Sequence, residues 1–157
     1  MTRLGRDGGD VSDADAVVVA VPGGAVAEAF DRLRGFEGKT TIDATNLYNV
    51  TPPRGFASNA EFVKSRTNGP TAKSFNVNFA SLFGRLGEAR ARPGNLWCGD
   101  DEAREVVEQL NRDAGYDPVR TGPLESAAAQ ERLIGVIFGI AETMGPYVYR
   151  FAPVDQL

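Results

Sequence analysis

The feature that most constrains the fold is a continuous run of small and β-branched apolar residues at 16–21, which stops at Pro22, Gly23 and Gly24. A strand that is buried on both faces of a helix-covered parallel sheet has this composition, because neither face offers a place for polar side chains. Pro-Gly-Gly then ends the strand and lets the chain turn. The run therefore predicts a buried strand of an α/β protein, followed by a tight turn.

Segments typical of strands and helices alternate along the rest of the chain. Apolar residues at helical spacing predict a helix over residues 26–34, closed by Gly35. Further strands are predicted at 39–44, 72–75, 95–98 and 116–120, and further helices at 60–66, 77–83, 103–114 and 133–144. This alternation predicts an α/β fold with a largely parallel sheet and flanking helices.

Composition excludes several kinds of chemistry. The 157 residues contain no His and a single Cys, which excludes histidine-dependent triads, histidine-ligated zinc and an intramolecular disulfide. The formal charge of −4 disfavours general binding to nucleic acid or to an anionic membrane surface. The apolar stretches are shorter than the roughly 20 residues of a membrane-spanning helix, and the start lacks the apolar core of a secretory signal. We therefore expect a cytoplasmic protein that binds neither nucleic acid nor membrane, and no metal site.

The ends of the predicted strands are where a ligand is expected. In open parallel sheets, ligands bind beyond the carboxyl ends of the strands, which here are residues 21–24, 44–46 and 75–76. These segments offer backbone groups and small polar side chains, which suit a flat, uncharged ring better than a metal. The alternative is purely structural, because Pro-Gly-Gly is a common strand-to-helix turn and Asn after a strand often only satisfies its loop.

Three sets of charged residues allow more than one interpretation. Asp43 lies inside a predicted strand, so it is either part of a buried structural network, which we favour, or a functional carboxyl group with a raised pKa. Asp100 and Asp101 precede a helix and are interpreted as its cap rather than as metal ligands. The basic residues of the middle third are interpreted as a solvated face, with binding of an anionic cofactor as the alternative: Lys64, Arg66, Lys73, Arg85, Arg90 and Arg92.

Four blocks of sequence resemble one known family. They are ADAVVVAVPGGAV from residue 14, GKTTIDATN from residue 38, AKSFN from residue 72 and WCGDDEAREVVEQLNRDAGYDPVRTGPLESA from residue 97. In order and spacing they are similar to the coenzyme F-420-dependent NADP oxidoreductase family over residues 14–133. The polar start at 1–13 has no helical or strand period and predicts a flexible leader. The resemblance implies a Rossmann-like domain at 14–122 and a C-terminal helical extension at 123–157.

The resemblance also implies a reaction, which is hydride transfer between NADP(H) and a deazaflavin (coenzyme F-420) or a similar small-molecule redox acceptor. Such a transfer needs proximity and orientation, so no catalytic side chain is expected. Val21, Pro22 and Gly23 are implied to lie beside the nicotinamide. The pocket where the two rings stack is implied to be lined by Thr45, Asn46, Phe75 and Asn76, with Leu124 and Glu125 on the acceptor side.

The chain departs from the family pattern at its start. Family members begin with a strand, a GxGxxG turn and a second strand, which hold the phosphates of NADP. Here the match begins at what would be the fourth strand. The sheet is therefore expected to be incomplete on its N-terminal side, with NADP binding weak or absent. The free edge of the strand at 16–21 is expected to be covered by the leader, by a rearrangement or by another chain, and we expect a homo-oligomer.

Two other functions stay open. One is a catalytically inactive, truncated remnant that acts as an oligomerising or interaction module. It would use the free strand edge and the helix that carries Gly135 and Gly139, whose GxxxG spacing permits close approach of another backbone, in the core or across a dimer. The other, weaker alternative is an NAD(P)-dependent reductase of the pyrroline-carboxylate or 6-phosphogluconate type, because the AVP element also occurs there.

Overall fold

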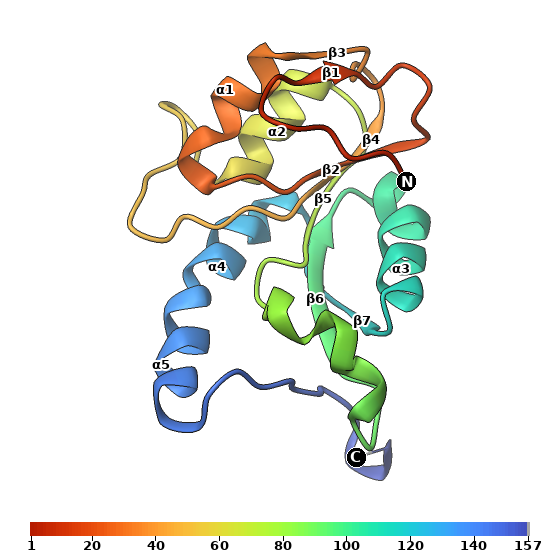
Figure 1. The fold of residues 1–157 in the computed structure, drawn as a ribbon, viewed down its shortest axis with the longest axis vertical. Helices are drawn as coiled ribbons and strands as arrows, with labels where there is room; N and C mark the ends of the chain where they lie inside the picture. The colour runs from red at the N-terminus through yellow and green to blue at the C-terminus, as the bar shows by residue number, and fades with distance from the viewer. Residues whose placement is uncertain (157) are drawn as a thin grey trace.

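A five-stranded sheet forms the centre of the computed structural model, which describes residues 1–156 (Figure 1). In sheet order its strands are β2 (Ala16–Val19), β4 (Thr40–Asp43), β5 (Thr71–Ser74), β6 (Gly94–Gly99) and β7 (Asp117–Gly122). Neighbouring strands are parallel except β5 and β6, which are antiparallel. The predicted Rossmann-like α/β fold with a largely parallel sheet is therefore confirmed.

Helices cover both faces of this sheet. They are α1 (Val26–Asp31), α2 (Asn59–Thr67), α3 (Arg104–Asp113), α4 (Ala127–Arg132) and α5 (Ile134–Met144). A longer 3-10 helix spans Ala80–Glu88, and short 3-10 turns lie at Gly23–Ala25, Asp101–Ala103, Leu124–Ser126 and Val154–Gln156. Helix α3 lies on one side of β6 and β7, whereas α4 and α5 lie on the other (Figure 1). Among residues 1–156, no helix combines the length and apolar character that crossing a bilayer requires.

The edge strand β2 is buried on one face only. Val17 and Val19 pack against α1 and α2, where Phe30 and Phe62 meet edge-on. Val18 points to the other face and is 47% exposed, because α3 packs over β5, β6 and β7 and does not reach β2. The prediction that this strand is buried on both faces is therefore wrong. Within the described chain, β4 is the single strand that pairs with β2.

Two local predictions fail for identifiable reasons. The helix predicted over 26–34 ends at Asp31, because Leu33–Arg34 forms a short strand, β3, that pairs in parallel with β1 (Gly9–Asp10) in the segment before β2. Asp100 does not cap the following helix. Its carboxylate instead accepts hydrogen bonds from the Lys64 ammonium at 2.7 Å and the Thr71 amide at 2.9 Å, which ties it to α2 and β5.

Candidate functional site

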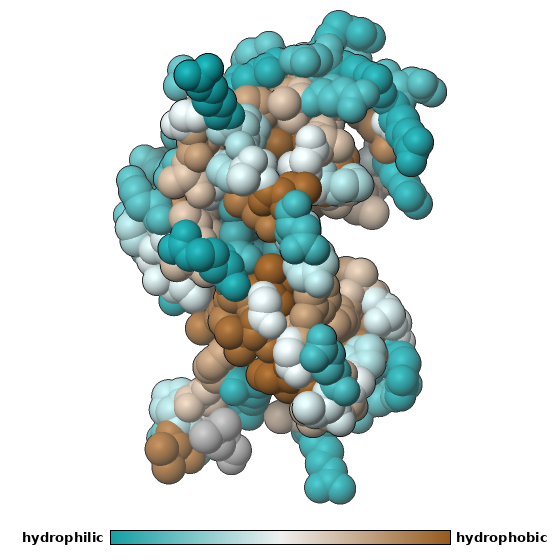
Figure 2. Space-filling view, turned by 90° about the vertical axis from the view of Figure 1, so that its left-hand side faces the viewer, coloured by the Kyte–Doolittle hydropathy of each residue, from teal (hydrophilic) through white to brown (hydrophobic). Residues whose placement is uncertain are grey.

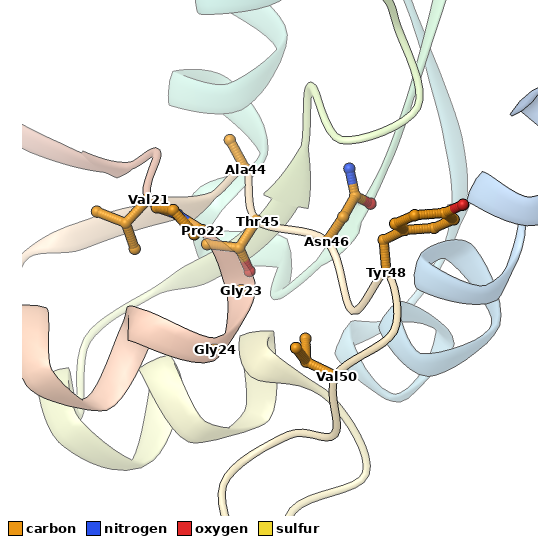
Figure 3. A pocket seen from close by; sticks show the side chains of 9 residues that line it. All are labelled: Val21, Pro22, Gly23, Gly24, Ala44, Thr45, Asn46, Tyr48 and Val50. Carbon is orange, nitrogen blue, oxygen red and sulfur yellow. The ribbon is translucent and has the colours of Figure 1, made fainter.

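A pocket of about 350 Å³ lies beyond the carboxyl ends of β2 and β4. These strands are parallel neighbours, so the segments that follow them meet at the same edge of the sheet. Figure 3 shows the turn after β2 on one side and the segment after β4 on the other; the lining residues are Val21, Pro22, Gly23, Gly24, Ala44, Thr45, Asn46, Tyr48 and Val50. None of these side chains is charged. The structure thus brings together five of the residues predicted to bind the cofactor.

A second pocket, of about 210 Å³, adjoins the first at Asn46. It is lined by Asn46, Asn76, Val77, Asn78, Phe79, Ala80, Ile134, Ile137 and Phe138. Asn46 and Asn76 hold each other in place: the Asn46 side-chain amide donates to the Asn76 carbonyl at 2.6 Å, and the Asn76 amide donates to Asn46 Oδ1 at 3.0 Å. Gln130 donates to Asn76 Oδ1 at 2.9 Å. Asn46, which lines both pockets, is therefore held in place by the side chain and backbone of Asn76.

Three predicted site residues lie away from both pockets. Phe75 has a left-handed φ of 62° and its ring packs edge-on against Phe83 and Tyr116. This conformation is rare for a bulky residue. Leu124 is buried in a cluster with Cys98, and Glu125 is exposed. Neither Leu124 nor Glu125 lines either pocket, so their place on the acceptor side stays a prediction.

A buried ionic cluster is joined to the first pocket through Thr45. The Lys73 side chain is fully buried, and its ammonium donates to Asp43 Oδ2 at 2.8 Å, Glu131 Oε1 at 2.6 Å and the Thr45 carbonyl at 2.6 Å. Each of its three protons therefore has an acceptor. The interpretation of Lys73 as part of a solvated face is wrong, because its strand β5 lies inside the sheet. The structural interpretation of Asp43 is confirmed.

This cluster is connected to both walls of the first pocket. Asp43 Oδ1 accepts a hydrogen bond from the Thr45 amide at 2.9 Å, and Glu131 Oε1 accepts one from the Asn59 amide at 3.2 Å. The Asn59 side chain in turn donates to the Gly23 carbonyl at 3.0 Å and to Thr45 Oγ1 at 2.8 Å. Asn59 and Glu131 were not predicted as site residues.

Burial also controls the ionisation of two groups near the site. It raises the pKa of the Cys98 thiol to about 11, so this cysteine is not a thiolate nucleophile at neutral pH. Burial likewise raises the pKa of the Glu131 carboxyl, and the nearby Lys73 ammonium offsets part of this rise. Glu131 Oε2 is buried without a hydrogen-bond partner among the described residues, which disfavours the ionised form further.

The raised pKa of Glu131 predicts a pH-dependent stability. The folded chain holds this proton more tightly than the unfolded chain, so the stabilisation is complete below the unfolded pKa of about 4.3 and is lost as pH rises through the folded pKa. The wild-type advantage over Glu131→Gln in free energy of unfolding should therefore be largest in acid and fall with pH. Urea unfolding at a series of pH values measures it, with the exposed Glu125→Gln as the control. An advantage that grows with pH would contradict the assignment.

Comparison with known proteins shows the fold. No protein-family model matches the chain, and a search of curated proteins found no match. A solved structure from Arthrobacter sp. FB24, described as a candidate F420-dependent NADP reductase, has a TM-score of 0.73 at 21% identity and covers 91% of this chain and 71% of its own. A hypothetical protein from Sinorhizobium meliloti has a TM-score of 0.61 at 24% identity, covering 74% of this chain and 60% of its own. The chain therefore shares the Rossmann-like α/β fold of these two proteins.

Proposed function

We propose that the chain is an oxidoreductase that brings a nicotinamide ring and a flat redox acceptor together at Asn46. The nicotinamide would bind in the pocket beyond β2 and β4, and the acceptor in the pocket against α5. The observation that carries this proposal is that Asn46 lines both pockets, so that ligands in the two would meet there. NADP(H) is the proposed cofactor and a deazaflavin such as coenzyme F-420 the proposed acceptor, as in the description of the Arthrobacter protein.

The residues present fit the nicotinamide end of such a cofactor. The first pocket offers small side chains and backbone groups and has no charged side chain in its described lining, which suits a flat ring. The bound cofactor supplies the hydride chemistry, which requires proximity rather than a protein acid or base. The role of the chain is then to hold the walls: the amide pair fixes Asn46, and the buried cluster fixes Thr45.

The residues present do not fit the phosphates of NADP. The sequence contains no GxGxxG turn, and no cationic side chain lines either pocket in the part of the chain that the structure describes. Helix α1, which follows Gly23 and Gly24, has six residues and is too short to provide a phosphate site at its N-terminus. We therefore assign the pockets to the two rings and assign no phosphate site.

Pockets that hold the two rings but no phosphate predict that the adenosine half of NADPH adds little to binding. Reduced nicotinamide mononucleotide and NADPH should bind with dissociation constants that agree within about tenfold, because the adenosine half of NADPH finds no charged partner. Calorimetric titration measures both constants. A ligand at 100 times its dissociation constant should also raise the free energy of unfolding by about 2.7 kcal/mol. The control ligand, 2′-phospho-ADP-ribose, lacks the nicotinamide and should not bind. Absence of binding by both nicotinamide compounds at millimolar concentration would contradict the proposal.

A non-catalytic association module is the second candidate function. It is favoured by two surfaces of the described chain, the half-exposed Val18 on the edge strand and the apolar outer side of α5. A chain that associates with itself but binds neither nicotinamide compound would support this candidate over the first.

A further inference from the structure

The polar side chains of the second pocket come from three asparagines, Asn46, Asn76 and Asn78, and its other described lining residues are apolar. Figure 2 shows hydrophobic residues gathered on the face of the molecule that includes α5, which forms one wall of this pocket. In a mostly apolar pocket, a few polar groups fix the orientation of the ligand. A side-chain amide has two N–H groups that donate and one oxygen that accepts, so the groups left free within the chain decide what a ligand can bind.

Asn46 ends a chain of three side-chain amides that all donate in the same direction. The Gln130 amide donates to Asn76 Oδ1 at 2.9 Å and to the Leu96 carbonyl at 3.2 Å. The Asn76 amide donates in turn to Asn46 Oδ1 at 3.0 Å and to the Gln130 carbonyl at 3.5 Å. The Asn46 amide donates to the Asn76 carbonyl at 2.6 Å. Each amide thus donates to a backbone carbonyl, which can only accept hydrogen bonds, and this fixes which side-chain atom is nitrogen and which is oxygen.

This chain of amides leaves one N–H group of Asn46 available. Asn46 Nδ2 donates to the Asn76 carbonyl, and within residues 1–156 it forms no second hydrogen bond. Both N–H groups of Asn76 have acceptors. So do those of Asn78, which donate to Asn95 Oδ1 at 2.7 Å and to the Gly94 carbonyl at 3.5 Å. Of the three asparagines in the pocket, Asn46 is therefore the one with an N–H group to offer a ligand.

Burial keeps the amides in this arrangement. Asn76 is 2% exposed and Gln130 is 5% exposed. If the Asn76 amide turned over, its oxygen would face Asn46 Oδ1 and the Gln130 carbonyl, and water could not reach the displaced groups to satisfy them. Asn46 itself is half-buried and lines both pockets. The buried part of the chain therefore fixes the orientation of the residue at which ligands in the two pockets would meet.

We propose that Asn46 determines the specificity of the second pocket by donating its free N–H group to a carbonyl oxygen at the edge of a flat redox acceptor. This inference rests on the proposed function, which places the redox acceptor in that pocket. A ring with such an oxygen satisfies the N–H group, whereas a ring of the same shape without one leaves it unpaired in apolar surroundings. Asn76 and Gln130 are positioning residues, because they keep the oxygen of Asn46 engaged and its N–H group available.

Two flat probes of matched shape and charge test this role by equilibrium dialysis of the full chain. Anthraquinone-2-sulfonate and anthracene-2-sulfonate share a three-ring frame and a sulfonate group, and only the quinone carries carbonyl oxygens on its ring. The wild type should bind the quinone more tightly, because the anthracene compound leaves the Asn46 N–H group unpaired. Equal affinities for the two probes, or no binding of the quinone, would overturn the proposal.

Asn46→Asp keeps the shape of the side chain and removes its N–H groups. It should weaken binding of the quinone at least about tenfold more than binding of the anthracene compound, whereas a merely loosened pocket would lose both probes alike. Asn78→Asp is the matched control, because it makes the same change in the same pocket but removes N–H groups that are bonded to Asn95 and Gly94. It should change both affinities by the same factor. If Asn46→Asp did the same, Asn46 would have a packing role only and the proposal would fail.

Gln130→Met tests the positioning role, because Gln130 lines neither pocket. The substitution removes the amide that donates to Asn76 Oδ1 and to the Leu96 carbonyl, so the Asn76 amide is free to turn over. The preference for the quinone should then fall toward that of Asn46→Asp. An unchanged preference would show that the chain of amides does not orient Asn46.

Titration with reduced nicotinamide mononucleotide separates this proposal from the proposed function. Nicotinamide binding by a wild type that shows no preference between the two probes would leave the oxidoreductase function standing and remove the role of Asn46. A preference that depends on Asn46, in a chain that does not bind the nicotinamide compound, would support the carbonyl-binding role and contradict the proposed function.

Discussion

Replacement of Lys73 by Met is expected to lower the free energy of unfolding by about 3–5 kcal/mol. Met has a similar volume and fills the same space in β5. It cannot neutralise Asp43 or donate to Glu131 and to the Thr45 carbonyl, which the ammonium contacts at 2.8, 2.6 and 2.6 Å. Removal of one partner from a buried ionic group leaves charge without compensation, which is far more costly than loss of a surface pair. Urea unfolding followed by the fluorescence of the buried Trp97 measures the loss.

Lys64→Met is the matched control for this substitution. Lys64 pairs with Asp100 at 2.7 Å, but its side chain is 40% exposed, so water screens the pair. Its replacement should lower the free energy of unfolding by about 1 kcal/mol or less. Combining Lys73→Met with Glu131→Gln should recover part of the stability, because one of the two stranded carboxyl groups is then removed. Equal losses for Lys73→Met and Lys64→Met would show that the buried cluster does not stabilise the fold.

The charges of this cluster were visible in the sequence, but their pairing was not. Asp43 lies inside a predicted strand, where a buried charge requires a partner, but nothing local to Lys73 distinguished it from the solvated basic residues. Their pairing depends on the register of β4 against β5, which places the two residues directly opposite each other. Register is set by contacts along the whole sheet. Glu131 comes from α4, far along the chain, and no local pattern connects it to the two strands.

The first pocket could be predicted because it follows from a local rule. Parallel neighbouring strands end at the same edge, so Val21, Pro22 and Gly23 meet Thr45 and Asn46 once β2 pairs with β4. The burial of β2 could not be predicted in the same way. Apolar composition is compatible with cover on both faces, but cover depends on where α3 packs, and α3 stays over the far strands.

Phe75 shows a different limit. Its position after a strand end predicts a role in the pocket, but its backbone is left-handed and its ring packs against Tyr116 and the core cluster that includes Val107 of α3. Gly and Asn are the residues that adopt this conformation most readily, and nothing in the sequence indicates that Phe75 does so. The same turn leaves Asn76 free to meet Asn46. Phe75 therefore points away from the second pocket, whereas Asn76 lines it.

Replacement of Gly23 by Ala is expected to destabilise the chain by about 2–3 kcal/mol and to open the first pocket. A Cβ at this position would overlap the carbonyl of Asn46 and come within 3.3 Å of the Asn59 side-chain amide. The overlapping atom is backbone, so relief requires separating the segments that follow β2 and β4. The Asn59 bonds to Gly23 and Thr45 would be lost in the same movement. Urea unfolding measures the stability, and titration with NADPH measures the effect on the proposed nicotinamide site.

The adjacent Gly24→Ala provides the control, because it makes the same chemical change one residue later. A Cβ on Gly24 would lie 3.6 Å from Val50 Cγ1, which is ordinary contact. Ala also reduces the freedom of the unfolded chain, so the variant should match the wild type or exceed its free energy of unfolding by about 0.4–1 kcal/mol. If the two variants were equally stable, the close approach of Gly23 to Asn46 would be disproved. If Gly23→Ala were unstable but bound NADPH as the wild type does, the fold would stand while the nicotinamide site would have to lie elsewhere.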